Sequence, residues 1–356
     1  MVADKEYMKL ALDLAQKAKG MTSPNPMVGC IIVKNNKIIG KGYHKKAGRG
    51  HAEIVALRNA GKNADGATMY VTLEPCSHYG KTGPCVNKII KAGIKEVIIA
   101  MKDPNPLVDG ISVLKKSKIK VTTGILEDEA RKLNEFWIKY ITTKKPFVLL
   151  KIAMTLDGKI AAKGKGLKYI TNTKSRAYVH ELRKDMDAVL VGVGTIINDN
   201  PELTTRLVKG KNPIKIVVDS TLKIPLNSKV FKGPGKLYVA TTVNAPKEKL
   251  GKIINKGAKI ILTKSKNGKV DLQDLMKKLG KLQITSLMIE GGQKIFNSAI
   301  KEKIADKIMI FIAPKVMGNG ISLIESLKLA KSDRINLRNI RVKKFEEDIM
   351  IEGYAK

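Results

Sequence analysis

The spacing of one histidine and two cysteines constrains this chain more than any other feature of its sequence. His51 is followed by Cys76 and Cys85, and each cysteine comes directly after a proline. One imidazole and two thiolates leave a fourth tetrahedral position open, which is typical of catalytic rather than structural zinc sites. The pattern therefore predicts that these three residues bind one Zn²⁺.

Glu53 is a further part of this pattern. We expect it to lie beside the metal without binding it. It lies two residues after His51, so on a helix its side chain points away from the ligand and can reach a water on the metal. Zinc nucleobase deaminases use a non-ligand glutamate in this way to move protons. Alone, a His-x-Glu pattern is common and carries no information, and a cysteine on a helix is usually a small core residue. Cys30 lies in an apolar strand segment, and we expect it to be a core residue. The conjunction favours a deaminase with Glu53 as its catalytic acid–base.

Strand and helix patterns alternate along residues 1–144. Apolar segments on both sides of Asn35-Asn36 predict a β-hairpin. The alternation beyond the hairpin predicts an α/β layered domain. The expected strands are 30–34, 37–43, 68–73, 97–101 and 119–123, and the expected helices are 51–60, 85–92, 112–116 and 127–141.

A second α/β block follows the join at Lys144-Lys145-Pro146, so the predicted domains are 1–144 and 145–356. We predict that Thr173 is the N-cap of its first helix. No Gly-x-Gly-x-x-Gly follows the first strand, so the ordinary Rossmann pattern is absent. The expected strands are 147–154, 188–193, 214–218, 236–240, 259–262, 286–289 and 308–313, and the expected helices are 173–184, 247–255, 272–279 and 293–300.

The composition is that of a folded protein with more than one domain. The chain has 356 residues, of which 43% are hydrophobic and 28% charged. No apolar run approaches the ~18 residues of a membrane span. The start of the chain reads as an amphipathic helix and not as a signal peptide. Three cysteines cannot form a dense disulfide framework. We therefore expect a soluble, cytoplasmic protein without a membrane partner.

The large positive charge leaves a function of another class open. The net charge is +35, with an excess of 13 over residues 1–145 and 22 over residues 146–356. A nucleic-acid-binding protein usually gathers such an excess in one patch. The even spread indicates a compositional bias that also attracts phosphorylated ligands. We expect no nucleic-acid partner, but a basic nucleic-acid-binding protein with a structural zinc remains the alternative.

Longer motifs resemble those of the bifunctional riboflavin-biosynthesis deaminase–reductases. In the first block these are TSPNPMVGC at 22–30, HAE at 51–53, EPCSHYGKTGPC at 74–85 and DPNP at 103–106. Residues 77–84 separate the two cysteines, a longer loop than in nucleoside or tRNA deaminases, which form the rival enzyme class. In the second block the motifs are KIAMTLDGKIA at 151–161, HELR at 180–183, VGVGT at 191–195, DNPELTTR at 199–206 and EGG at 290–292.

This resemblance implies a fold and two reactions. The fold would be a cytidine-deaminase-like three-layer α/β/α domain followed by a dihydrofolate-reductase-like α/β domain. The first reaction would be zinc-dependent deamination of 2,5-diamino-6-ribosylamino-4(3H)-pyrimidinone 5′-phosphate. The second would be NADPH-dependent reduction of the ribosyl side chain, giving 5-amino-6-ribitylamino-uracil 5′-phosphate. The implied cofactors are Zn²⁺ and NADPH, the partner is this small phosphorylated pyrimidine, and we expect a homo-oligomer, a dimer or tetramer.

The resemblance also assigns site residues, whose types suit these tasks. Arginine pairs well with phosphate, and a glycine before a helix lets phosphate approach its N-terminus. Lys151 and Glu290 would be catalytic residues together with Glu53. The substrate contacts would be Asn25, His44, Ser77, Lys81, Asp103, Asn105, Leu167, Arg183, Leu203, Arg206 and Glu290. The cofactor contacts would be Met154, Tyr169, Thr195, Asp199, Ser220, Gly291 and Gly292.

Two positions in the second block depart from the pattern of this family. Leu167 stands where a serine usually touches the substrate, and Tyr169 stands where a tryptophan usually packs on the cofactor. Tyrosine keeps an aromatic face, but leucine cannot form a hydrogen bond. An active deaminase with an impaired or altered reductase is therefore a further alternative.

Overall fold

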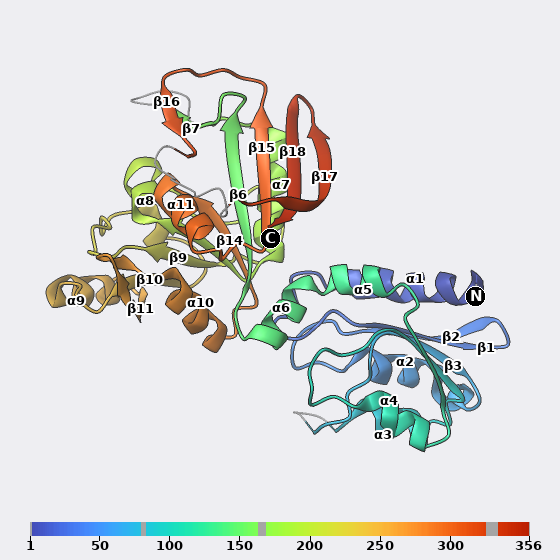
Figure 1. Ribbon diagram of the computed structural model, residues 1–356. Helices are drawn as coiled ribbons and strands as arrows, with labels where there is room; N and C mark the ends of the chain where they lie inside the picture. Colours follow the sequence, from blue (N-terminus) through green and yellow to red (C-terminus); the bar gives the residue numbers. More distant parts are fainter. Residues whose placement is uncertain (1, 80–82, 163–168, 325–333, 356) are drawn as a thin grey trace. The chain divides into compact units, whose positions relative to one another are not determined.

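The computed structural model describes residues 2–79, 83–162, 169–324 and 334–355 (Figure 1). Two of the predicted substrate contacts, Lys81 and Leu167, lie outside these residues. The chain divides into two compact units, Met1–Lys144 and Lys145–Lys356.

The first unit is built on a five-stranded sheet with the order β2-β1-β3-β4-β5. β1 pairs antiparallel with β2 and β3, whereas β3, β4 and β5 run parallel. Parallel strands release their following loops at the same edge of the sheet. The strands are β1 (Gly29–Lys34), β2 (Lys37–Tyr43), β3 (Thr68–Leu73), β4 (Glu96–Met101) and β5 (Lys120–Thr123).

Helices cover both faces of this sheet and give the unit three layers (Figure 1). α1 and α5 lie on one face, and α2, α3 and α4 lie on the other. Aliphatic side chains between the layers form the core, which includes Cys30, as expected. The helices are α1 (Val2–Gln16), α2 (Ala52–Ala60), η1 (Gly61–Ala64), α3 (Cys85–Lys91), α4 (Gly110–Lys116), α5 (Glu127–Leu133) and α6 (Glu135–Thr143).

Two glycines on β2 bring α2 unusually close to the sheet. A Cβ on Gly42 would lie 2.3 Å from the carbonyl oxygen of Ala52, and one on Gly40 would lie 2.4 Å from that of Ala56. Larger residues would push the helix away, because such contacts are far inside van der Waals distance. The close packing fixes the start of α2, where His51 and Glu53 lie.

The second unit is built on a nine-stranded sheet with the order β11-β10-β9-β8-β14-β6-β15-β18-β17. All strands from β11 to β15 in this order run parallel, and β18 and β17 close one edge antiparallel. The strands are β6 (Phe147–Thr155), β8 (Ala188–Gly192), β9 (Ile214–Val218), β10 (Leu237–Thr242), β11 (Lys259–Thr263), β14 (Ser286–Gly291), β15 (Lys307–Ala313), β17 (Leu337–Phe345) and β18 (Asp348–Ala355).

Two short antiparallel strand pairs and a set of helices belong to the same unit. The pairs are β7 (Lys159–Ala162) with β16 (Gly320–Ser322), and β12 (Ser265–Lys266) with β13 (Lys269–Val270). The helices are α7 (Thr173–Asp185), α8 (Val193–Asp199), η2 (Lys229–Phe231), α9 (Lys247–Asn255), α10 (Leu272–Lys281) and α11 (Gln293–Lys301).

Several local predictions were wrong. Asn172, not Thr173, caps α7, because its side-chain oxygen accepts a hydrogen bond from the Ser175 N–H at 2.9 Å. The single helix expected at 127–141 is two helices that meet at Asn134. The strands β17 and β18 were not predicted. β17 is exposed along most of its length, and its pairing with β18 shifts register between Arg338 and Arg341, which interrupts the alternation that marks a strand.

Within the described residues, no helix is both long enough and apolar enough to cross a membrane.

Candidate active sites

The three predicted metal ligands meet in the first unit. His51 adopts an extended conformation directly before α2, with φ −66° and ψ 157°. Its Nδ1 lies 3.1 Å from Sγ of Cys85 and 3.6 Å from Sγ of Cys76. All three ligand atoms lie within 4.8 Å of one another. Tetrahedral zinc with bonds of about 2.0–2.3 Å holds such atoms roughly 3.5–3.8 Å apart. The donor set and its spacing therefore fit zinc.

The two thiols differ in how readily they lose a proton in the absence of a metal. A hydrogen bond with Cys85 is the main cause that lowers the pKa of Cys76 to about 4, and His51 and the Cys85 backbone N–H also contribute. That N–H, at the first residue of α3, lies 3.3 Å from Cys76 Sγ. The same thiol–thiol bond, together with burial, raises the pKa of Cys85. Cys85 would therefore release its proton on binding a metal.

Glu53 lies beside these ligands and is almost completely buried, with 4% of its surface exposed. Burial is the largest effect on this carboxyl and raises its pKa above the usual value. A glutamate with a raised pKa exchanges protons more readily near neutral pH than an exposed one does. This is the property that a proton-transferring residue needs.

Asn25 and His44 form one hydrogen-bonded pair next to the ligands. His44 is buried, its ring centroid lies 5.6 Å from that of His51, and its Nε2 lies 3.1 Å from Asn25 Nδ2. His44 Nδ1 lies 3.1 Å from the carbonyl oxygen of Gly50. Because only a protonated Nδ1 can donate to that carbonyl, we assign Nε2 as the acceptor from Asn25. The side-chain oxygen of Asn25 is thereby directed away from His44.

Ser77, Asp103 and Asn105 belong to two loops that touch each other. Ser77 Oγ accepts a hydrogen bond from the backbone N–H of Asp109 at 2.8 Å. Asp103 Oδ1 accepts one from the Asn105 N–H at 2.8 Å. Burial is the largest cause that raises the pKa of Asp103 to about 6, and the nearby charge of Glu74 adds to it. These residues therefore lie at the carboxyl ends of β3 and β4, together with Cys76.

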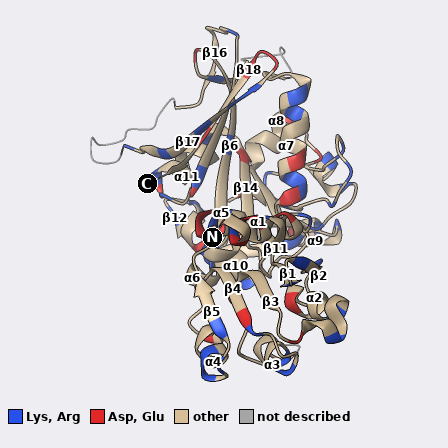
Figure 2. Cartoon of the chain, turned by 90° about the vertical axis from the view of Figure 1, so that its right-hand side faces the viewer, with Lys and Arg blue, Asp and Glu red and all other residues tan. Residues whose placement is uncertain are grey.

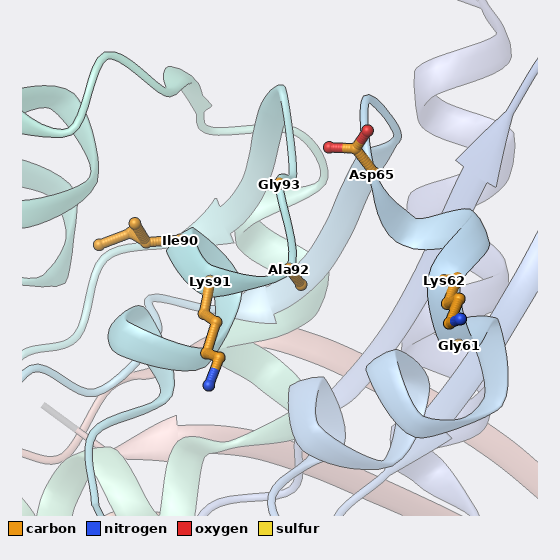
Figure 3. Close-up of a pocket in the computed structure, with 7 residues that line it drawn as sticks. All are labelled: Gly61, Lys62, Asp65, Ile90, Lys91, Ala92 and Gly93. Atoms are coloured by element: carbon orange, nitrogen blue, oxygen red, sulfur yellow. The ribbon is translucent and has the colours of Figure 1, made fainter.

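A separate pocket of the first unit lies between η1 and the C-terminal end of α3 (Figure 3). It is lined by Gly61, Lys62, Asp65, Ile90, Lys91, Ala92 and Gly93. These residues come from η1 and its end, and from the C-terminal end of α3. None of them is a predicted site residue, so this pocket is distinct from the predicted metal centre.

In the second unit, Lys151, Arg183 and Glu290 form a buried ion cluster. Arg183 binds both carboxylate oxygens of Glu290, with Nε–Oε1 and Nη2–Oε2 distances of 2.5 Å and 2.9 Å. Lys151 Nζ lies 3.4 Å from Oε2. Burial alone would raise the pKa of Glu290, but Arg183 and Lys151 outweigh it and hold the pKa at about 2. Glu290 is therefore ionised at neutral pH.

The segment after α8 contributes Leu203 and Arg206 near this cluster. Arg183 also donates to the Thr204 carbonyl oxygen at 2.8 Å, which ties the cluster to this segment. Leu203 is buried in a left-handed conformation with φ 56°. Arg206 is exposed and lies close enough to His180 to lower its pKa. The arginine side chain is thus free to reach a ligand from solvent.

Most predicted cofactor contacts lie at the carboxyl ends of parallel strands. β6 contains Met154, β14 ends at Gly291, and α8 begins directly after β8 and carries Thr195 and Asp199. A Cβ on Gly292 would lie 3.1 Å from Thr195 Oγ1, so the absence of a side chain on Gly292 lets its backbone lie close to Thr195. The N-terminus of α11 follows Gly292 and suits a phosphate group. These residues and the helix N-terminus are therefore suited to bind a dinucleotide.

Two other predicted cofactor contacts, Ser220 and Tyr169, interact with other residues of the second unit. Ser220 follows β9, and its Oγ accepts a hydrogen bond from the Val270 N–H at 3.0 Å. Tyr169 is 44% exposed, and the guanidinium carbon of Arg176 lies 4.4 Å from its ring centroid. Arginine stacks well on aromatic rings, so Tyr169 has a defined partner on one face.

Sequence reasoning overlooked two buried residues beside the sites. His180 is 4% exposed, and burial followed by the charges of Arg183 and Arg206 lowers its pKa to about 4, so it is neutral at pH 7. Glu74 is 7% exposed and binds the loop that carries Asp103. Both residues belong to motifs named above, HELR for His180 and EPCSHYGKTGPC for Glu74. For Glu74, the available signal was a charged residue directly after a buried strand.

Family models cover both units. The model "Cytidine and deoxycytidylate deaminase zinc-binding region" matches residues 1–101, and "RibD C-terminal domain" matches residues 146–351. The riboflavin biosynthesis protein RibD of Aquifex aeolicus is 46% identical over 98% of this chain and 97% of its own length. That of Escherichia coli is 37% identical over 95% and 96%. The chain belongs to the RibD family.

Solved structures of RibD proteins show the same fold over the whole chain. The Thermotoga maritima diaminohydroxyphosphoribosylaminopyrimidine deaminase/5-amino-6-(5-phosphoribosylamino)uracil reductase aligns with a TM-score of 0.87 at 36% identity, covering 100% of this chain and 99% of that one. Acinetobacter baumannii RibD aligns with a TM-score of 0.90 at 33% identity and the same coverage.

These findings confirm the predicted resemblance, fold class and pair of enzyme classes. They also confirm zinc for the deaminase domain and NADPH for the reductase domain. Neither the nucleic-acid-binding alternative nor the impaired reductase is supported. Lysine and arginine are spread over elements of both units, among them α3, α4 and α7 (Figure 2). The roles of individual site residues remain predictions.

The metal centre gives a direct prediction. Cys85→Ser should lower the zinc content well below one ion per chain, because a hydroxyl is a much poorer zinc ligand than a thiolate. The measurement is metal analysis of protein that has been chelator-washed and reloaded with zinc. Cys30→Ala is the matched control, because it removes a core cysteine outside the site and should keep the zinc. Parent-like zinc binding by Cys85→Ser would show that the ligand set is wrong.

Proposed function

We propose that this chain catalyses two consecutive steps of riboflavin biosynthesis. Residues 1–144 hydrolyse the 2-amino group of 2,5-diamino-6-ribosylamino-4(3H)-pyrimidinone 5′-phosphate, and residues 145–356 reduce the ribosyl side chain with NADPH. The observation that carries the proposal is the separation of the His51, Cys76 and Cys85 group in one unit from the Lys151–Glu290 ion pair in the other, within a chain that matches RibD proteins end to end.

In the deaminase, His51, Cys76 and Cys85 would hold zinc. When bound, zinc lowers the pKa of water and so supplies a nucleophile near neutral pH. Glu53 accepts a proton from the attacking water and passes it to the pyrimidine, so that the amino group leaves as ammonia. Its burial supports this role, because the raised pKa brings the carboxyl closer to the pH at which it must both accept and release a proton.

Recognition of the pyrimidine falls to polar groups around this centre. Asn25 keeps its side-chain oxygen available as an acceptor for a ring N–H, because its amide nitrogen is engaged with His44. Ser77, Asp103 and Asn105 lie on the adjoining loops and can read the other ring atoms. Lys81 is proposed to bind the phosphate as a point charge, as its place in the motif suggests.

In the reductase, NADPH supplies the hydride when it is bound. Met154, Tyr169, Thr195, Asp199, Ser220, Gly291 and Gly292 are the proposed cofactor contacts. Lys151 orients the sugar or supplies the proton that accompanies the hydride, and Glu290 holds the ammonium group of Lys151 in place. Arg183, Leu203, Arg206 and Leu167 are the proposed substrate contacts. Because Glu290 already uses two N–H groups of Arg183, Arg206 is the better candidate for the phosphate.

We also propose a cytoplasmic location and a homo-oligomer, a dimer or tetramer. NADPH and free phosphorylated intermediates are cytoplasmic metabolites, and thiolate ligands require reducing conditions. The edge strand β17 exposes Ile340 and Val342 by 58% and 66%. Apolar edge strands are usually covered in the native assembly. The proposed partners are otherwise small molecules, without nucleic acid or membrane.

The assignment of Arg206 to the substrate can be tested by kinetics. Arg206→Ala should raise the KM for the phosphorylated substrate on the order of tenfold or more, because a charged hydrogen bond is lost. The KM for NADPH should change much less. Lys209→Ala, which removes another exposed cation of the same segment, is the control. A change confined to the NADPH constant would reassign Arg206 to the cofactor.

The separation of the two chemistries can be tested with Glu53→Gln. Glutamine keeps the shape but cannot carry a proton, so ammonia release should fall by about 10²–10⁴-fold or more. Zinc should stay bound, because Glu53 is not a ligand. Reduction of pre-deaminated substrate by the same protein should be almost unchanged, because Lys151 and Glu290 lie in the other unit. Loss of both activities with normal zinc content would contradict two separate sites.

A further inference from the structure

Glu74 is a buried carboxylate that the proposed mechanism does not use. It is the first residue after β3 and lies two residues before the ligand Cys76. Only 7% of its surface is exposed. Its backbone N–H donates to the carbonyl oxygen of Met101, the last residue of β4, at 3.0 Å. Glu74 therefore stands where two parallel strands deliver the loops of the metal centre.

Both oxygens of this carboxylate bind one loop. Oε2 accepts a hydrogen bond from the backbone N–H of Asp103 at 3.1 Å, and Oε1 accepts one from that of Ile111 at 3.0 Å. A single side chain thus holds both ends of the segment 103–111, which consists of the loop after β4 and the first two residues of α4. Hydrogen bonds to a charged group are among the stronger ones in proteins. Both carboxylate oxygens therefore have partners in this segment.

Two further contacts press the same segment against the metal-ligand loop. Asp109 donates its backbone N–H to Ser77 Oγ at 2.8 Å. Gly110 lies so close to Pro75 that a Cβ would come within 2.0 Å of its carbonyl oxygen. The segment therefore has no room to move toward the ligand loop, and Glu74 prevents it from moving away.

The anchor reaches the proposed substrate contacts directly. Asp103 is held by Glu74 at its backbone, and its Oδ1 in turn accepts the Asn105 N–H. Asn105 Oδ1 accepts the Leu107 N–H at 3.2 Å. A displacement of the backbone at Asp103 would shift both side chains. Recognition groups must be held within about 0.5 Å of their productive positions, so this anchor matters for binding.

We propose that Glu74 is a positioning residue of the deaminase, which sets the distance between the metal-ligand loop and the substrate-recognition loop 103–111. This inference rests on the proposed deaminase function. Glu74 acts on the binding of the pyrimidine, whereas Glu53 acts on proton transfer and the three ligands act on the metal.

The test is Glu74→Gln in the full-length, zinc-loaded protein. Glutamine has the same size but only one acceptor oxygen, and its NH₂ group faces the second backbone N–H, so one end of the loop is released. We expect the KM of the diaminopyrimidinone phosphate to rise at least about tenfold. The kcat for ammonia release should change much less. Zinc content and the reductase activity of the same protein should stay at the parent level.

Glu96→Gln is the matched control. Glu96 begins β4 at the opposite end of the strand, and its carboxylate binds Lys120 Nζ at 2.8 Å. This variant removes the same charge from the same sheet, on the neighbouring strand and away from the loop, so all kinetic constants should stay at the parent level. If Glu74→Gln yields no folded protein, Glu74→Asp keeps the charge but retracts the carboxylate by one methylene, and the same rise in KM is expected.

The outcomes separate the inference from the proposed function. An unchanged KM in a folded Glu74 variant would overturn the positioning role. A loss of zinc and kcat with an unchanged KM would also overturn it, because Glu74 would then support the metal ligands. Absence of ammonia release by the parent protein, with zinc bound, would instead contradict the deaminase function itself.

Discussion

Glu290 stays ionised inside the second unit because Arg183 and Lys151 face it. Removing both cations would leave a buried charge without compensation, and breaking a buried ion pair typically costs about 3–5 kcal/mol. Glu53, in the first unit, is buried with a raised pKa. The two carboxyls are therefore suited to opposite tasks: Glu290 keeps its charge and holds a lysine, whereas Glu53 can gain and lose a proton. Environment, and not residue type, divides these roles.

The parallel strands determine where such groups can stand. In the first unit, Cys76 follows β3 and Asp103 follows β4; in the second, Thr195 follows β8 and Gly292 follows β14. The carboxyl ends of parallel strands share one edge of a sheet, so residues far apart in sequence meet there. Close packing then fixes the distances, as with the glycines of β2 beneath α2 and Gly110 against Pro75. Both sites thus depend on backbone contacts as much as on their side chains.

The features that the sequence could predict are those that depend on residue type and local spacing. His51, Cys76, Cys85 and Glu53 were predictable because metal chemistry restricts both residue type and spacing. The fold class followed from the alternation of strands and helices. Asn172 was missed as a cap because either of two adjacent polar residues satisfies the local pattern, and only the geometry selects one.

Features that depend on tertiary contacts were not readable in advance. The proposed anchoring role of Glu74 depends on the backbone N–H groups of Asp103 and Ile111, which lie 29 and 37 residues away in the sequence. The break between α5 and α6 at Asn134 accompanies a side chain that binds both the N–H and the carbonyl oxygen of Met27. Such pairings have no local signature, so they appear only when the strands and loops are placed in space.

The central claim is that one chain performs deamination and reduction in separate units. Mass spectrometry of the products formed from the diaminopyrimidinone phosphate, with and without NADPH, tests it most directly. Without NADPH, we predict a product in which an amino group is replaced by oxygen and the ribosyl chain is intact. With NADPH, the ribitylamino-uracil phosphate should accumulate. A substrate that is returned unchanged in both mixtures, by protein with zinc bound, would contradict the account.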